Sequence, residues 1–126
     1  MAVVGIGTDL CSVARIREAW SRHEQFCARI CTAQERAYIG RSAERLAARF
    51  AAKEAAFKAF GLGLGPLGWH DVEVLHDDKG RPQLILSEKA LAIAGEMGIE
   101  RWQVSLSHER EMAIAVVILE GKVCTC

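Results

Sequence analysis

Glu54 is the acidic residue whose place in the sequence most requires a charged partner. It lies in an alanine-rich segment, and a helical rotation of about 100° per residue puts it roughly 40° from Phe50, inside the apolar stripe. A carboxylate in such a stripe is costly unless a cation, a metal ion or a hydrogen-bond network offsets its charge. The alternative interpretation is a simple helical ion pair with Lys58, one turn further along.

Asp9 is the second candidate carboxylate. It follows residues 2–8, a β-branched segment that predicts a short strand, and Gly5 and Gly7 on the same side of that strand would let a backbone or a ligand come close. A turn-forming or helix-capping role for Asp9 is the alternative. If Asp9 meets Glu54, the pair would suit Mg²⁺, which takes one or two oxygen ligands from the protein and the others from phosphates and water.

Basic side chains that could bind phosphate lie on the same predicted helix. They are Arg49, Lys53 and Lys58. The glycine-rich loop that begins at Gly61 could admit a nucleotide, although it follows the carboxyl end of the helix, where the dipole disfavours phosphate. This loop lacks the P-loop signature, so nucleotide binding would depend on the basic side chains.

His108 is the histidine best placed by the sequence to meet a phosphate. It ends a predicted strand in front of the charged turn 109–111, and a solvent-facing loop histidine is the alternative. The other histidines show no metal-ligand spacing and are interpreted as surface residues: His23, His70 and His76.

Local patterns predict the elements that must position these side chains. The strongest is a helix over residues 42–60, free of glycine and proline and ended by Gly61 in a left-handed cap. Ser12 is predicted to cap an earlier helix, and Thr32 and Glu35 match a capping box that begins another. The other predicted elements are a hairpin over 72–86, a helix over 87–97, and strands over 102–107 and 112–119.

The order of these elements predicts an α+β fold, a small antiparallel sheet packed by a long central helix. The last strand is apolar on both sides, as in a strand covered on both faces. No internal repeat or boundary interrupts the pattern, so residues 1–126 are predicted to form a single domain.

Composition excludes several classes of function. Sixteen basic and sixteen acidic residues cancel, which argues against charge-driven binding to nucleic acid or membrane. The longest apolar run, 112–119, is too short to span a bilayer, and the N-terminus lacks a secretory signal, so a cytoplasmic protein is expected. The five cysteines contain no Cys-x-x-Cys pair and are predicted to be free thiols: Cys11, Cys27, Cys31, Cys124 and Cys126.

Three segments together resemble one family. The segments 5–9 (Gly-Ile-Gly-Thr-Asp), 49–61 (Arg-Phe-Ala-Ala-Lys-Glu-Ala-Ala-Phe-Lys-Ala-Phe-Gly) and 105–108 (Ser-Leu-Ser-His) are similar in order and spacing to the holo-(acyl-carrier-protein) synthases. The central segment matches the aromatic-x-x-Lys-Glu-(Ser/Ala)-x-x-Lys signature of the 4'-phosphopantetheinyl transferase superfamily. The resemblance covers about residues 3 to 119.

The resemblance implies a compact 4'-phosphopantetheinyl transferase fold, assembled as a homotrimer through its sheets, with active sites between subunits. It implies that Asp9 and Glu54 are magnesium ligands and that Lys58 lies near the pyrophosphate of coenzyme A. Arg49 and His108 correspond to positions that approach the 3'-phosphate. The predicted coenzyme A site also includes Lys53 and Gly61, and the predicted carrier-docking residues are Arg15, Arg22, Phe26 and Arg29.

The expected activity is magnesium-dependent transfer of 4'-phosphopantetheine from coenzyme A to a serine of apo acyl carrier protein in fatty acid biosynthesis, releasing 3',5'-ADP. Glu54, Asp9 or a metal-bound water could accept the proton of the serine. One alternative is the same transferase serving polyketide or peptide synthetase carriers. Another is a non-catalytic module that binds coenzyme A or a carrier without turnover.

Overall fold

The computed structural model describes residues 1–122, which form an α+β fold and confirm the predicted class. Its strands are β1 (Ala2–Ser12), β2 (Val72–His76), β3 (Pro82–Leu86), β4 (Ile99–His108) and β5 (Met112–Gly121). Its helices are α1 (Val13–Arg22), α2 (Phe26–Ile30), α3 (Ala33–Ile39), α4 (Ala43–Phe60) and α5 (Glu88–Glu96), with a 3₁₀ turn, η1, at Trp69–Asp71.

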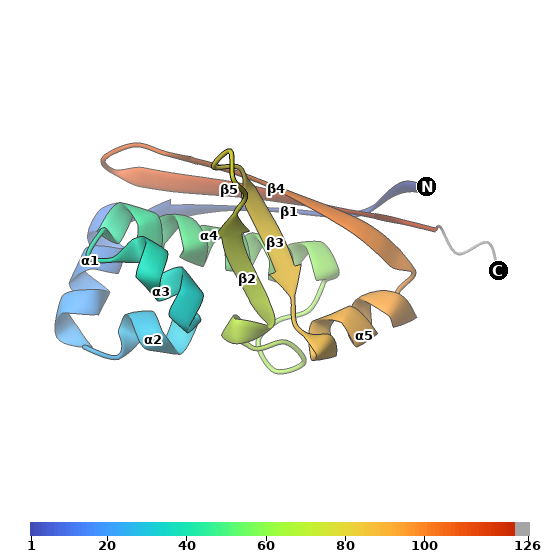
Figure 1. Ribbon diagram of the computed structural model, residues 1–126, viewed down its shortest axis with the longest axis horizontal. Coiled ribbons are helices and arrows are strands. Elements are labelled where there is room, and N and C mark those ends of the chain that lie inside the picture. The colour runs from blue at the N-terminus through green and yellow to red at the C-terminus, as the bar shows by residue number, and fades with distance from the viewer. Residues whose placement is uncertain (123–126) are drawn as a thin grey trace.

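A three-stranded antiparallel sheet in the order β1-β5-β4 forms one layer, and α4 lies along one of its faces (Figure 1). The helices α1 to α3 lie at one end of α4, and α5 lies towards the other (Figure 1). The β2–β3 hairpin crosses beside α4 and is tied to β4 by a hydrogen bond from the Trp102 indole Nε1 to the Leu84 carbonyl oxygen, 2.8 Å long. The helix α4 is therefore the central element of the fold.

The bounds of α4 follow from its end residues. Ser42 begins it by accepting a hydrogen bond at its side-chain oxygen from the Arg45 amide, 3.1 Å away, and Gly61 ends it at φ 73°, as predicted. The helix is buried on nearly every side rather than along one stripe, because the sheet covers its alanines while Trp69 packs on Phe50 and Phe57. Burial all round is typical of a helix at the centre of a domain.

Gly5 and Gly7 let β1 lie directly on the backbone of α4, which confirms that a backbone comes close at these positions. A methyl group added at Gly7 would overlap the Ala55 carbonyl oxygen and lie 2.7 Å from the Ala59 amide nitrogen. Alternate residues of a strand face the same side, so Asp9 faces α4 as well. Close packing at Gly7 thus sets the distance between Asp9 and the axis of α4.

We expect Gly7→Ala to lower the free energy of unfolding by about 3 kcal/mol, because neither backbone can yield without moving the other. Urea unfolding followed by circular dichroism measures this change. Gly63→Ala is the matched control, since nothing lies within 4 Å of a methyl group there and Gly63 does not have a positive φ. Equal stability of the two variants would contradict the packing described above.

The strand β1 runs to Ser12, beyond the predicted limit of residue 8, because its pairing with β5 continues to the Ser12–Met112 pair. Asp9 is therefore inside the strand, opposite Ala115, rather than at its exit. Ser12 still caps α1, accepting a hydrogen bond from the Arg15 amide. The hydrogen-bonded pairing of β1 with the ten-residue strand β5 outweighs the weak strand propensity of residues 9–12.

The sheet is covered on one face only within this chain, so the prediction that β5 is covered on both faces is wrong for a single copy. Residues Ala113, Ala115, Val117 and Leu119 of β5 are buried on the side of α4. Large apolar side chains are exposed elsewhere on the sheet: Val3, Ile6, Leu10 and Ile114. An exposed apolar surface of this kind is typical of a face that contacts another protein.

Three cysteines are free and buried, as predicted: Cys11, Cys27 and Cys31. Cys124 and Cys126 lie outside the described residues. None of the helices between residues 1 and 122 combines the length and the apolar character needed to cross a bilayer.

Candidate active site

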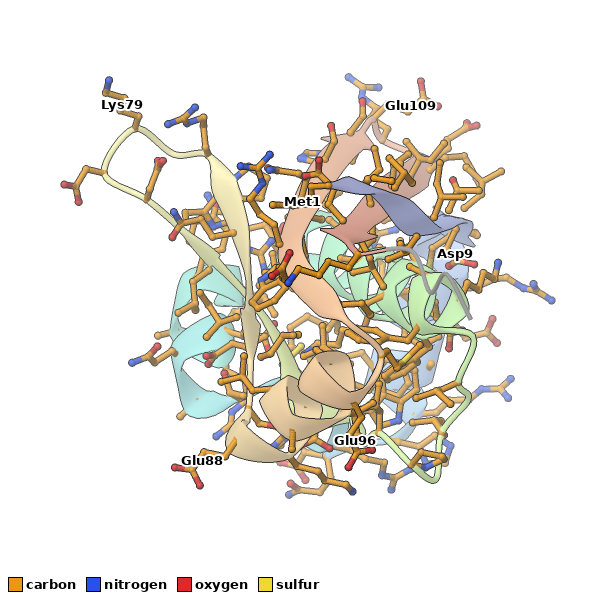
Figure 2. The ribbon with its side chains drawn as sticks, turned by 90° about the vertical axis from the view of Figure 1, so that its right-hand side faces the viewer. Met1, Asp9, Lys79, Glu88, Glu96 and Glu109 are labelled. Carbon is orange, nitrogen blue, oxygen red and sulfur yellow. The ribbon has the colours of Figure 1, made fainter. Side chains whose placement is uncertain are left out.

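Asp9 and Glu54 line the same cavity, which has a volume of about 460 Å³. The strand β1 supplies Asp9 and the middle of α4 supplies Glu54, and the apolar wall behind them includes Ile16, Phe26 and Phe50. Figure 2 shows Asp9 beside α4, at the opposite side of the view from the hairpin tip at Lys79. The structure thus brings together the two carboxylates that the sequence singled out.

The electrostatics of this cavity favour a cation between the two carboxylates. Burial raises the pKa of Glu54, the negative charge of Asp9 raises it further, and Lys58 lowers it in part. Within residues 1–122 no group of three or more His, Cys, Asp or Glu side chains could hold a metal ion. Two carboxylates fit Mg²⁺, which draws its remaining ligands from phosphate and water, better than an ion held by protein ligands alone.

Lys58 pairs with Asp9. Its Nζ donates to the Asp9 carboxylate oxygen Oδ1 at 3.1 Å and to the Thr8 carbonyl oxygen at 3.0 Å, while more than half of the side chain is exposed. The alternative interpretation, an ion pair between Glu54 and Lys58, is therefore wrong for this structure. Lys58 instead places an accessible positive charge directly beside Asp9.

A second cavity, with a volume of about 530 Å³, holds the other predicted phosphate contacts. Arg49 of α4 and His108 at the end of β4 line it, together with Tyr38 of α3, Arg45 of α4 and His76 of β2. The ring nitrogen Nδ1 of His108 lies 3.7 Å from Glu44 Oε2. This cavity is basic, because Arg45 and Arg49 line it and Glu44 is the one carboxylate among its lining residues.

The two cavities lie on different sides of α4 and share no lining residue. Arg49 and Glu54 are five residues apart, which corresponds to about 140° of rotation around the helix axis. One chain therefore does not bring Arg49 and His108 together with Asp9 and Glu54.

Lys53 is not available to a phosphate, so its prediction as a coenzyme A contact is wrong. Its side chain is fully buried, and its Nζ donates to Glu35 Oε1 at 2.8 Å and to the carbonyl oxygens of Trp69 and Val72 at 3.0 and 2.6 Å. These three acceptors use all the hydrogens of the ammonium group. The residue before Glu54 thus anchors α4 to the 3₁₀ turn and β2.

Gly61 lines neither cavity and has a structural role, because it ends α4 in the left-handed conformation. Its prediction as a coenzyme A contact has no support in the described chain.

Two of the four predicted carrier-docking residues lie at the first cavity. Arg15 and Phe26 line it beside the carboxylates. Arg22 is exposed in the last turn of α1 and pairs with Glu18 at 2.8 Å, and Arg29 is exposed in the last turn of α2. The structure therefore places Arg15 and Phe26 next to the candidate site and Arg22 and Arg29 further along α1 and α2.

Three residues that the sequence did not single out as functional surround Arg49 and Lys53. His76, interpreted as a surface residue, is half-buried, and its ring stacks on Tyr38 with centroids 4.3 Å apart. Glu35 was predicted only as part of a capping box, yet it is also the buried partner of Lys53. The Tyr38–His76 stacking and the Glu35–Lys53 ion pair join segments far apart in the chain, so local sequence patterns do not predict them. The one signal in the sequence is the apolar neighbourhood of Lys53, which indicates a buried lysine.

Comparison with known proteins identifies the family. Residues 5–117 match the model of the 4'-phosphopantetheinyl transferase superfamily. A holo-(acyl-carrier-protein) synthase of Moorella thermoacetica is 42% identical over 118 residues, which are 91% of this chain and 92% of that protein.

Two solved structures share the fold closely. The crystal structure of holo-(acyl-carrier-protein) synthase from Neisseria meningitidis has a TM-score of 0.87 at 35% identity and covers 94% of this chain and 98% of its own. The Helicobacter pylori enzyme in complex with coenzyme A has a TM-score of 0.84 at 31% identity, covering 91% and 99%. This chain therefore belongs to the 4'-phosphopantetheinyl transferase superfamily and, within it, to the holo-(acyl-carrier-protein) synthases.

Proposed function

We propose that this chain transfers the 4'-phosphopantetheine arm of coenzyme A to a serine of apo acyl carrier protein, in fatty acid biosynthesis. The observation that carries the proposal is the Asp9–Glu54 pair in one cavity, with Lys58 paired to Asp9, in a member of this family. The relative in complex with coenzyme A supports the donor substrate. We also propose that residues 1–126 act as one transferase domain in the cytoplasm.

The reaction needs a site that holds a pyrophosphate and presents it to a hydroxyl group. The serine oxygen attacks the phosphorus that carries pantetheine, the P–O bond within the pyrophosphate breaks, and 3',5'-ADP leaves with the bridging oxygen. When bound, Mg²⁺ supplies positive charge that stabilises the phosphate oxygens. Asp9 and Glu54 are the residues that would hold it, and the proton of the serine passes to this carboxylate cluster or to solvent.

Lys58 contributes from its place beside Asp9. The ammonium group beside Asp9 offsets negative charge that builds on the pyrophosphate as its bond breaks. The apolar wall behind the carboxylates excludes water from one side of the reacting phosphate, which strengthens these interactions.

We propose a homotrimer with sites between subunits. The apolar outer face of the sheet supports assembly through the sheets, since Ile6 and Leu10 are more than 60% exposed in one chain. The opposite placement of the two cavities on α4 supports a shared site. One coenzyme A molecule would contact Asp9 and Glu54 of one protomer and the basic cavity of its neighbour.

The carrier is proposed to dock along α1 and α2, where Arg15, Arg22 and Arg29 are exposed. We expect Arg22→Glu to raise the KM for the carrier by roughly tenfold, because a like charge then faces the acidic partner. The kcat and the KM for coenzyme A should not change. Lys79→Glu, the same charge reversal at the hairpin tip, should leave all three constants unchanged, and an equal effect in both variants would contradict docking at α1.

The activity is tested directly by incubating the protein with apo carrier, coenzyme A and MgCl₂ and measuring the intact mass of the carrier. Addition of the phosphopantetheine arm, lost when a chelator is present, is the expected result. Parallel reactions with a fatty-acid carrier and with a synthetase carrier domain determine the preferred target. Binding of coenzyme A without mass addition to either carrier would contradict the transferase proposal.

A further inference from the structure

Arg49 is a buried cation that forms no ion pair with any residue the structure describes. Its side chain is only 2% exposed, and no carboxylate within residues 1–122 forms an ion pair with it. Its Nε has no hydrogen-bond partner among the described atoms, and its Nη1 donates to the Arg45 carbonyl oxygen at 3.4 Å. Burying an uncompensated charge is costly, so a structure that keeps one requires a reason.

The remaining contacts of Arg49 are two neutral rings. Its Nη2 lies 3.0 Å from Nδ1 of His76, and its guanidinium carbon lies 4.3 Å from the centre of the Tyr38 ring. A guanidinium group has donors only, so Nδ1 of His76 must accept, and the ring must be neutral with its proton on Nε2. Tyr38 stacks on this ring and fixes its plane.

The groups around His76 keep it neutral. Burial lowers the pKa of His76, the charges of Arg49 and Arg45 on α4 lower it further, and Asp77 next in the chain opposes them. Tyr38 from α3 presents its ring face to the imidazole. His76 therefore holds the guanidinium in place by a hydrogen bond and leaves its positive charge uncompensated.

Arg49 and His76 both line the basic cavity. We propose that His76 is a positioning residue of this cavity. It orients Arg49 through a neutral acceptor, so that an anionic group of the bound ligand neutralises the charge of Arg49. The inference rests on the proposed function, in which the anionic group is a phosphate of coenzyme A. A carboxylate in place of His76 would supply an internal counter-ion and compete with that phosphate.

Two substitutions differ in charge alone and separate orientation from charge. The side-chain oxygen of Asn or Asp is bonded to Cγ, as Nδ1 is in histidine, so both variants can accept from Arg49. His76→Asn keeps a neutral acceptor, and its KM for coenzyme A should stay within about twofold of the wild-type value. His76→Asp should raise this KM by roughly tenfold with unchanged kcat, and should raise the melting temperature because the buried charge is now paired.

A third variant and a control complete the set. His76→Leu removes the acceptor, and it should both raise the KM for coenzyme A and lower the melting temperature. His70→Asp introduces the same negative charge at an exposed histidine whose ring nitrogen Nε2 lies 2.9 Å from the Ala28 carbonyl oxygen, and it should leave the KM for coenzyme A unchanged. A purely structural role for His76 predicts that affinity and stability fall together, whereas the proposal predicts opposite changes in His76→Asp.

Binding of 3',5'-ADP, measured by calorimetry, separates this inference from the proposed function. If the wild-type protein transfers the arm but His76→Asp binds 3',5'-ADP as tightly as His76→Asn, the inference about His76 is wrong and the proposed function stands. If no transfer occurs but 3',5'-ADP binding weakens in His76→Asp and not in His76→Asn, the inference stands and the proposed function fails.

Discussion

Replacing Glu54 with glutamine is expected to lower the kcat of phosphopantetheine transfer by roughly 10²- to 10³-fold, the loss typical of removing a charged group that acts on the reacting atoms. Glutamine has the same shape but no charge, so it weakens the attraction of the site for a divalent ion while leaving α4 unchanged. The half-buried position of Glu54 makes its charge more effective than that of an exposed carboxylate. Transfer is measured by intact mass of the carrier at saturating coenzyme A over a range of MgCl₂ concentrations.

Glu96→Gln, which removes an exposed carboxylate from α5, should retain wild-type transfer. The kcat of Asp9→Asn should fall to a level similar to that of Glu54→Gln. The kcat of the double variant should be little lower, because both carboxylates serve one site. Full transfer by Glu54→Gln in the presence of magnesium would overturn the assignment of this cavity as the active site.

The Glu54→Gln variant also tests whether the site is shared between protomers. Arg49→Ala, with Glu54 intact, removes one of the two arginine charges that line the other cavity and should be weakly active in its own right. After the two variants are unfolded together and refolded, mixed trimers should regain part of the wild-type transfer, since one interface then combines an intact Glu54 with an intact Arg49. No gain over the separate variants would contradict a site built from two protomers.

Replacing Lys53 with methionine is expected to lower the free energy of unfolding by about 3–5 kcal/mol, the usual cost of removing one partner of a buried ion pair. The substitution leaves the Glu35 carboxylate buried with hydrogen bonds from the Thr32 and Val74 amides alone. It also leaves the Trp69 and Val72 carbonyl oxygens without their donor. Urea unfolding at neutral pH, followed by tryptophan fluorescence, measures the loss.

Lys79→Met, at an exposed turn position, should change stability by less than about 0.5 kcal/mol and is the matched control. Glu35→Gln in the Lys53→Met background should recover part of the loss, because no buried charge then remains. A cost near that of Lys79→Met would mean that Lys53 reaches solvent and would reopen its prediction as a phosphate contact.

The sequence predicted most elements closely where a local signal carried the information. The capping box at Thr32 and Glu35, the helix over residues 42–60 with its left-handed Gly61, and the hairpin over residues 72–86 depend on contacts within a few residues. The end of β1 was misplaced because strand length depends on the partner strand, and the pairing with β5 is a long-range interaction.

Only part of the candidate site was predicted from the sequence, because only part of it depends on local geometry. The alternation of Gly5, Gly7 and Asp9 along one strand, and the rotation that puts Glu54 among apolar neighbours, are local geometry. The environment of each basic residue was not local. Lys53 has the same charge as Lys58, but Lys53 is buried against Glu35 and Lys58 is exposed beside Asp9.

By itself, therefore, the sequence determined the fold class, the two candidate carboxylates and the resemblance to one family, because periodicity, capping and motif spacing are written along the chain. Only the tertiary structure decided which cations face a ligand, which lysine holds the core, and that a neutral His76 holds Arg49. The physical reason is that the burial of a side chain and its hydrogen-bond partners depend on distant segments brought together by packing, and a charge is stable only where those partners permit it.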